Sequence, residues 1–98
     1  MPWRIVQQPD GLFARFSTIV DMFTDYDMTY DEALEVCLEE MGRRYAPGKI
    51  QSGIDAGNER WLDELDTIKV VHGKKYYNMV IRAIVDKDPE AQEWLTKH

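Results

Sequence analysis

The chain has 98 residues, 44% of them hydrophobic, and 18 acidic against 12 basic side chains give it a net charge of −6. This length predicts a single domain, 1–98, with enough apolar material to fold without cross-links. The single cysteine excludes an intramolecular disulfide framework, and no apolar run approaches the ~20 residues of a membrane span. The first residues lack an export signal, so we expect a cytoplasmic protein. The acidic balance disfavours non-specific binding to duplex DNA.

The first twenty residues have the pattern of a β-hairpin. Two apolar-rich runs flank Pro9-Asp10-Gly11, a sequence in which Pro presets φ, Asp bonds its own backbone and Gly accepts a positive φ. We therefore predict strands near residues 3–8 and 12–19. The segment Asp21 to Asp27 is either a third short strand or an irregular lead-in. The alternating set that we assign to the core face of the second strand is Leu12, Ala14, Phe16, Thr18 and Val20, which leaves Phe13 on the opposite face.

A capping box opens the first predicted helix. Thr29 and Glu32 have the spacing at which each side chain bonds the other residue's amide, and Gly42 is a natural helix stop. The helix should therefore run from about Tyr30 to Met41. Its predicted apolar stripe consists of Tyr30, Ala33, Leu34, Cys37, Leu38 and Met41, with Glu35, Glu39 and Glu40 facing outward.

The middle of the chain gives a mixed signal. Residues 43–58 contain Pro47 and three glycines, so we expect either a short helix after Pro47 or a mobile connector. A helical period resumes at Trp61 and ends at Gly73, and it places His72 on the apolar face.

The segment YYNMVIRAIV, residues 76–85, is the most apolar of the chain. Polar residues recur every four positions around it, which predicts a helix near 75–86 that is buried almost all round and serves as a central post. Asp88 and Pro89 then predict the cap and first turn of a last helix, ending near Thr96. The predicted fold is α+β, with an N-terminal hairpin packed on three to five helices.

An acidic run is the main candidate for a functional surface, because no Lys or Arg occurs between Phe16 and Gly42. Such a run suits a partner with a positively charged groove. It does not fit a calcium loop, since Tyr30 and Val36 stand where that loop needs Gly and Glu. We predict no metal, no cofactor and no catalytic residue. The residues that we assign to partner binding are Asp21, Asp25, Asp27, Asp31, Glu35 and Glu39.

Two alternative functions remain open. A nucleic-acid-associated regulator would use the cations Arg43, Arg44, Lys49, Lys74 and Lys75, and a small basic-aromatic patch would combine Arg43, Arg44, Tyr45, Lys49 and Arg60. A small enzyme or small-ligand binder would use His72, Cys37 and nearby tyrosines, with His72 as the base for Cys37 provided that the fold brings the two together.

Two resemblances concern the first forty residues. The motifs WRIVQQP, ARFS, VD-x-F and DMT-x-x-EA resemble the openings of small uncharacterised proteins of phages and other mobile elements, over residues 1–41. The order of hairpin, extended segment and Thr-x-x-Glu-Ala-Leu helix resembles the HicB-type antitoxin domain. These resemblances imply a mobile-element accessory protein. The small size, the acidic asymmetry and the lack of a catalytic constellation lead us to expect a non-enzymatic protein that binds and modulates a host protein or nucleoprotein. An anti-defence inhibitor of the anti-CRISPR type is one concrete form, and an antitoxin-like regulator is another.

Overall fold

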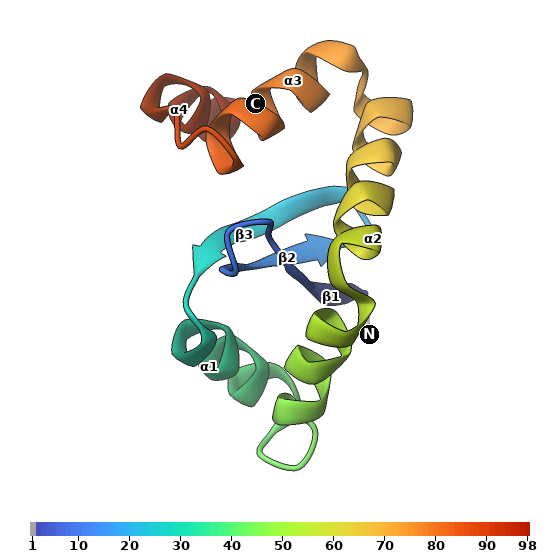
Figure 1. Ribbon diagram of the computed structural model, residues 1–98, viewed down its shortest axis with the longest axis vertical. Coiled ribbons are helices and arrows are strands. Elements are labelled where there is room, and N and C mark those ends of the chain that lie inside the picture. The colour runs from blue at the N-terminus through green and yellow to red at the C-terminus, as the bar shows by residue number, and fades with distance from the viewer. Residues whose placement is uncertain (1) are drawn as a thin grey trace.

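A three-stranded antiparallel sheet forms the middle layer of the molecule, with helices on both of its faces (Figure 1). The computed structural model describes residues 2–98. Strands β1 (Trp3–Gln7), β2 (Phe13–Ser17) and β3 (Met22–Met28) are neighbours in chain order. The predicted α+β class and hairpin are confirmed, and the segment from Asp21 to Asp27 supplies a third strand rather than an irregular lead-in.

The turn between β1 and β2 uses the residues that predicted it. The Gln8 N–H donates to the Leu12 carbonyl at 2.7 Å, and the Asp10 carboxylate accepts from the Leu12 N–H at 3.0 Å. Gly11 adopts a φ of 88°, a left-handed conformation that a residue without a Cβ takes at little cost.

The second strand ends earlier than predicted. β2 stops at Ser17, whose hydroxyl oxygen accepts from the N–H groups of Ile19 and Val20 and so turns the chain. Thr18 and Val20 were predicted on the core face, but both are exposed in this turn. Their assignment was wrong because the apolar alternation continues for three residues beyond the last sheet position.

Both faces of the sheet are buried. Val6 and Phe16 face one helical layer, whereas Ile5 and Phe13 face the other. Phe13 was predicted on the outer face, yet only 4% of its surface is exposed. A simple alternation assumes one covered face, and a sheet enclosed on both sides does not follow that rule.

Four helices follow the sheet within residues 2–98, and the caps of the first and last are as predicted. Thr29 and Glu32 form both bonds of the capping box, and the first helix ends just before Gly42. The Asp88 carboxylate accepts from the Glu90 N–H at 3.0 Å and caps the last helix. The helices are α1 (Tyr30–Met41), α2 (Ala46–His72), α3 (Lys74–Ile84) and α4 (Pro89–Lys97).

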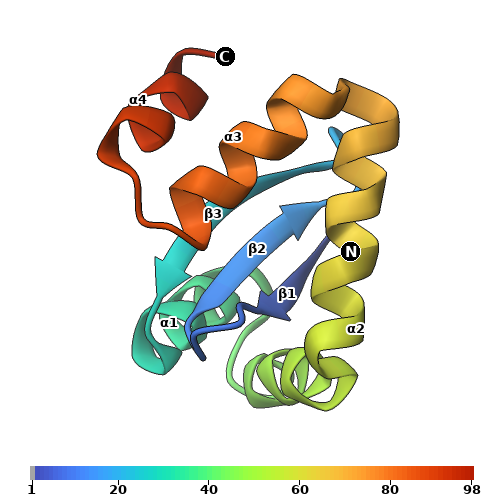
Figure 2. The ribbon, with the colours of Figure 1, turned by 45° about the horizontal axis from the view of Figure 1, so that its top comes forward.

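Most of the undecided segment 43–58 is helical. α2 begins at Ala46 with Pro47 in its first turn, where the missing proline N–H costs nothing. The backbone leaves the helical region at Gly57, with φ 61° and ψ −153°, so α2 consists of two halves joined by a kink. Figure 2 shows α2 running beside β1, the edge strand of the sheet.

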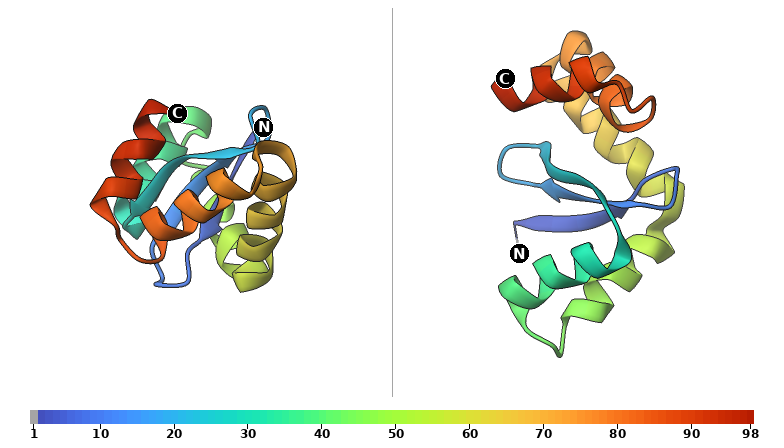
Figure 3. Two further views of the ribbon diagram at one scale, coloured as in Figure 1. Left: turned by 90° about the horizontal axis from the view of Figure 1, so that it is seen from above. Right: turned by 90° about the vertical axis from the view of Figure 1, so that its left-hand side faces the viewer.

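The two halves of α2 belong to two different cores. Ile50 in the first half packs with α1 on one face of the sheet, and Trp61 and Leu65 in the second half pack with α3 on the other; Figure 3 shows the sheet between these layers. The first core contains Trp3, Ile5, Phe13, Met28, Ala33, Cys37, Ala46 and Ile50, and the second contains Val6, Phe16, Trp61, Leu65, Ile68, Val80, Ala83, Ile84 and Ala91.

The helix predicted near 75–86 exists, but it is buried along one side only. Val80, Ala83 and Ile84 are buried, whereas Lys74 and Asn78 are exposed. α3 therefore covers the second core from outside, and the position of central post belongs to α2. The prediction on His72 was also wrong, because its side chain is exposed at the end of α2 and not part of an apolar face.

Gly53 allows α2 to contact β1 directly, and a substitution at this position tests that contact. A Cβ built on Gly53 would lie 2.7 Å from the carbonyl oxygen of Ile5, a backbone atom that cannot rotate away. Gly53→Ala should therefore lower the free energy of unfolding by about 1–3 kcal/mol, the usual cost of overpacking, in urea denaturation.

Gly48 is the matched control in the same helix. A Cβ at Gly48 meets nothing within 4 Å, and its φ is not positive. Gly48→Ala should raise the free energy of unfolding by about 0.4–1 kcal/mol, because alanine restricts the unfolded chain more than glycine does. Equal effects at both positions would show that the close contact with β1 is absent.

Candidate functional site

A groove lined by carboxylates lies between β3 and α1. Its volume is about 420 Å³, and we call it the acidic groove. Asp25 comes from β3, and Glu32, Glu35 and Glu39 come from successive turns of α1. The complete lining is Asp25, Tyr26, Met28, Glu32, Glu35, Val36 and Glu39.

The structure brings together half of the residues that we assigned to partner binding. Asp25, Glu35 and Glu39 all line the groove. Asp21 lies in the turn before β3 with a φ of 54°, and Asp31 is exposed in the first turn of α1. Neither residue lines the groove, and Asp27 does not line it either.

Glu32 is a groove residue outside the set that we assign to partner binding. It belongs to the predicted capping box, and its carboxylate accepts from the Thr29 N–H at 3.0 Å. The spacing of Glu32, Glu35 and Glu39 is i, i+3, i+7, which places all three on one helix face. That spacing would have been sufficient to include Glu32.

The groove carboxylates differ in how strongly they are neutralised. Arg15 forms an ion pair with Asp25 at 2.7 Å and approaches Glu40 at 4.0 Å. Among the ion pairs of residues 2–98, none involves Glu35 or Glu39. These two carboxylates are exposed to solvent, and no cation of the described residues lies beside them.

Asp27 belongs to a polar network that holds three segments together. Lys87, from the loop between α3 and α4, contacts Asp27 at 2.5 Å and Asp10 of the hairpin turn at 2.6 Å. The buried Gln8 side chain donates to the Asp27 carboxylate at 2.9 Å and accepts from the Asp27 N–H at 2.7 Å. Burial alone would lower the pKa of Lys87, but the two carboxylates outweigh it and raise the pKa. Asp27 therefore has a structural role.

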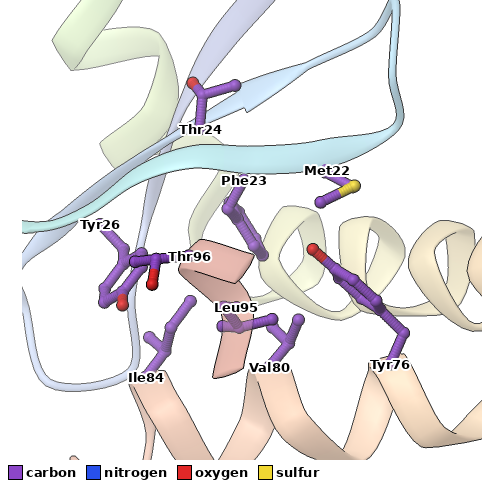
Figure 4. Close-up of a pocket in the computed structure, with 9 residues that line it drawn as sticks. All are labelled: Met22, Phe23, Thr24, Tyr26, Tyr76, Val80, Ile84, Leu95 and Thr96. Carbon is purple, nitrogen blue, oxygen red and sulfur yellow. The ribbon is translucent and has the colours of Figure 1, made fainter. Parts of the chain in front are cut away.

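On the opposite side of β3 lies a smaller, mainly apolar cavity of about 140 Å³ (Figure 4). Phe23 and Tyr26 point into it from the strand, and Tyr76 and Val80 face them from α3. Burial raises the pKa of both tyrosines, and the charge of Asp27 adds to the effect at Tyr26. The complete lining is Met22, Phe23, Thr24, Tyr26, Tyr76, Val80, Ile84, Leu95 and Thr96.

Cys37 and His72 are not brought together. Cys37 is fully buried in the first core, and burial raises the pKa of its thiol against the opposing charges of Lys49 and Arg15. His72 lies at the end of α2 and contacts the Val20 carbonyl through its Nε2 at 2.9 Å and the ring of Tyr76. The thiol and the imidazole therefore belong to different parts of the molecule.

Residues 2–98 contain neither a metal-binding cluster nor a membrane-spanning helix. No three or more His, Cys, Asp or Glu side chains gather as a metal site would need. No described helix has both the length and the apolar character to cross a membrane.

The cations named for nucleic-acid binding are also dispersed. The turn that contains Arg43 and Arg44 and the junction that precedes Lys74 and Lys75 lie at opposite ends of the long axis (Figure 1), which measures 39 Å. Lys49 lies in the first turn of α2, directly after the turn that contains Arg43 and Arg44, and it lines a cavity with Arg4 and Arg60.

Comparisons of this chain with protein-family models, curated proteins and solved structures find no match.

Glu64 is a buried carboxylate outside the groove. Only 3% of its side chain is exposed, and Arg4 contacts its two oxygens at 3.1 and 3.2 Å. Burial raises the pKa of Glu64, and the attraction of Arg4 opposes this shift without cancelling it, so the pKa stays above 4.5.

This shift predicts a pH dependence of stability. A carboxyl group with a raised pKa binds its proton more readily in the folded state, so its contribution is fully present below pH 4.5 and is lost as the pH rises through the folded pKa. Glu64→Gln lacks this titration. Urea unfolding at a series of pH values should therefore show wild type losing stability relative to the variant toward neutral pH. A constant difference, or one that grows in favour of wild type, would contradict the raised pKa.

Proposed function

We propose that this protein is a non-enzymatic binding protein that holds a basic segment of its partner in the acidic groove. The observation that carries the proposal is the convergence of Asp25 with three carboxylates of α1 on one groove. Arginine and lysine are the side chains that such a groove attracts, because opposite charges on two surfaces steer association and set specificity.

Two apolar residues of the groove also favour a partner with lysine or arginine side chains. Met28 is buried and Val36 is half-buried, and both line the groove between the carboxylates. Lysine and arginine carry long apolar stems below their charged heads. A stem lying on Met28 and Val36 would bring its head to Glu35 or Glu39, so that apolar and ionic contacts act together.

The identity of the partner is proposed from the sequence. The resemblance of residues 1–41 to small phage and mobile-element proteins favours a host protein or nucleoprotein with a basic groove, in the cytoplasm. Occupying such a groove would inhibit or modulate the host molecule, as an anti-defence protein of the anti-CRISPR type does. The acidic groove would then stand in for the nucleic-acid phosphates that the partner normally binds.

Within residues 2–98, three groove carboxylates form no ion pair, namely Glu32, Glu35 and Glu39. The test removes Glu35 and Glu39 and keeps Glu32, because Glu32 caps α1. Fluorescence anisotropy of a labelled oligo-arginine peptide should show saturable binding to wild type at about 0.15 M salt. The double variant Glu35→Gln/Glu39→Gln should bind about 2–30-fold more weakly, since each exposed ion pair contributes roughly 0.2–1 kcal/mol.

The control changes the net charge equally at a distance from the groove. Asp63 and Asp66 are exposed on α2, which packs on β1 at the edge of the sheet opposite β3, and neither lines the acidic groove. Asp63→Asn/Asp66→Asn should therefore bind the peptide as wild type does, because distant surface charges are screened. Equal weakening by both double variants would mean that the peptide senses net charge alone, and the groove would then have no role.

A further inference from the structure

A second polar cavity, of about 250 Å³, lies on the β1 side of the molecule, and we call it the basic cavity. Three cations line it: Arg4 from β1, and Lys49 and Arg60 from the two halves of α2. No carboxylate is among its lining residues, although the protein as a whole has a net charge of −6. The complete lining is Trp3, Arg4, Ile5, Thr18, Lys49, Ser52 and Arg60.

The path of α2 creates this cavity. Gly53 brings the first half of the helix against the Ile5 carbonyl, so Lys49 and Ser52 reach the edge of β1. The kink at Gly57 then redirects the second half, and Arg60 approaches the same edge from beyond the kink. Thr18, in the turn after β2, completes the wall.

The cations are only partly neutralised. Arg4 is paired with Glu64, but none of the ion pairs in residues 2–98 involves Lys49 or Arg60. Lys49 lies over the ring of Trp3, with its Nζ 5.0 Å from the ring centre. Burial lowers the pKa of Lys49, and the charges of Arg60 and Arg4 add to this, against the opposing influence of Cys37.

Three carboxylates line a neighbouring cavity. Glu59, Asp63 and Glu64 surround it together with Arg4 and Arg60, which the two cavities share. Glu64 attracts Arg4 and Arg60 and offsets part of their charge, but no carboxylate of residues 2–98 pairs with Lys49. Lys49, Arg4 and Arg60 repel one another, and an anion bound between them would relieve this repulsion.

We infer that the basic cavity binds the phosphate group of a small phosphorylated molecule. Arginine and lysine supply the charge-assisted hydrogen bonds that phosphate oxygens accept, and the hydroxyls of Thr18 and Ser52 add neutral donors. A small anion enters a local positive field, whereas a nucleic-acid strand would also meet the negative charge of the surrounding surface. This site is independent of the acidic groove, which lies between β3 and α1.

The probe is inorganic phosphate, titrated into the full chain at constant ionic strength and followed by amide chemical shifts in NMR. Saturable shifts should concentrate at Thr18, Lys49, Ser52 and Arg60, with a Kd on the order of 1 mM or below. Arg60→Gln and Lys49→Gln should each weaken binding about tenfold, which is the usual scale for a lost hydrogen bond to a charged group.

Arg44→Gln is the matched control, since Arg44 is an exposed cation outside the basic cavity. It should bind phosphate as wild type does. Loss of binding in Arg44→Gln equal to that in Arg60→Gln, or shifts spread over all surface cations, would overturn the site. Wild type that binds a short oligothymidylate but not phosphate would overturn the choice of a small ligand. Circular dichroism of each variant verifies that weaker binding does not reflect unfolding.

Discussion

The close contact between Gly53 and the Ile5 carbonyl is the constraint on which the arrangement of the other elements depends. A side chain on Gly53 would push α2 away from β1, because even a Cβ would lie 2.7 Å from a backbone oxygen. With glycine there, the helix lies directly on an edge strand. That strand would otherwise present unpaired backbone groups to solvent, and a covering helix is one way in which proteins protect such an edge.

The contact between α2 and β1 also explains how one helix covers both faces of the sheet. A straight helix would cover one face of the sheet, but the kink at Gly57 lets the second half of α2 continue past β1 to the other face. Each half then buries its own apolar residues, Ile50 on one side and Trp61 with Leu65 on the other. One helix thereby connects two cores that the sheet separates, and its kink also creates the basic cavity.

The same layout separates charge on the surface. The carboxylates of α1 and β3 gather at one edge of the sheet, and the cations of β1 and α2 gather at the other. Because the two groups lie at opposite edges, neither neutralises the other directly. A protein with a strong overall negative charge therefore retains one place that attracts anions, and we assign the two edges to two different ligands.

Local signals in the sequence predicted the elements whose ends are determined by local chemistry. The turn at Gly11, the capping box at Thr29 and the cap at Asp88 all hydrogen-bond to their own neighbours, so their positions did not depend on the fold. Burial could not be predicted in the same way. Phe13 and the helix after Gly73 were misjudged because periodicity reveals which residues are apolar, not how many layers cover them.

The candidate sites also contain some features that local sequence predicts and others that depend on the fold. Glu35 and Glu39 share one helix face and line the groove, as their spacing indicates, whereas the contact of Asp27 with Lys87 joins residues sixty positions apart and has no local signal. The grouping of Arg4 with Arg60 depends on the kink of α2. Residues 43–58 contain three glycines, and their sequence does not indicate that the kink occurs at Gly57. Both the environment of Asp27 and the basic cavity are therefore formed by segments that are far apart in the sequence.

A methyl and aromatic NOESY spectrum of the isotope-labelled protein tests most directly whether α2 serves both faces of the sheet. Our account predicts cross-peaks from the Ile50 methyl groups to residues of the first core, such as Phe13, and from the Leu65 methyl groups to residues of the second, such as Phe16. Cross-peaks from Ile50 and Leu65 to the same face of the sheet would contradict it.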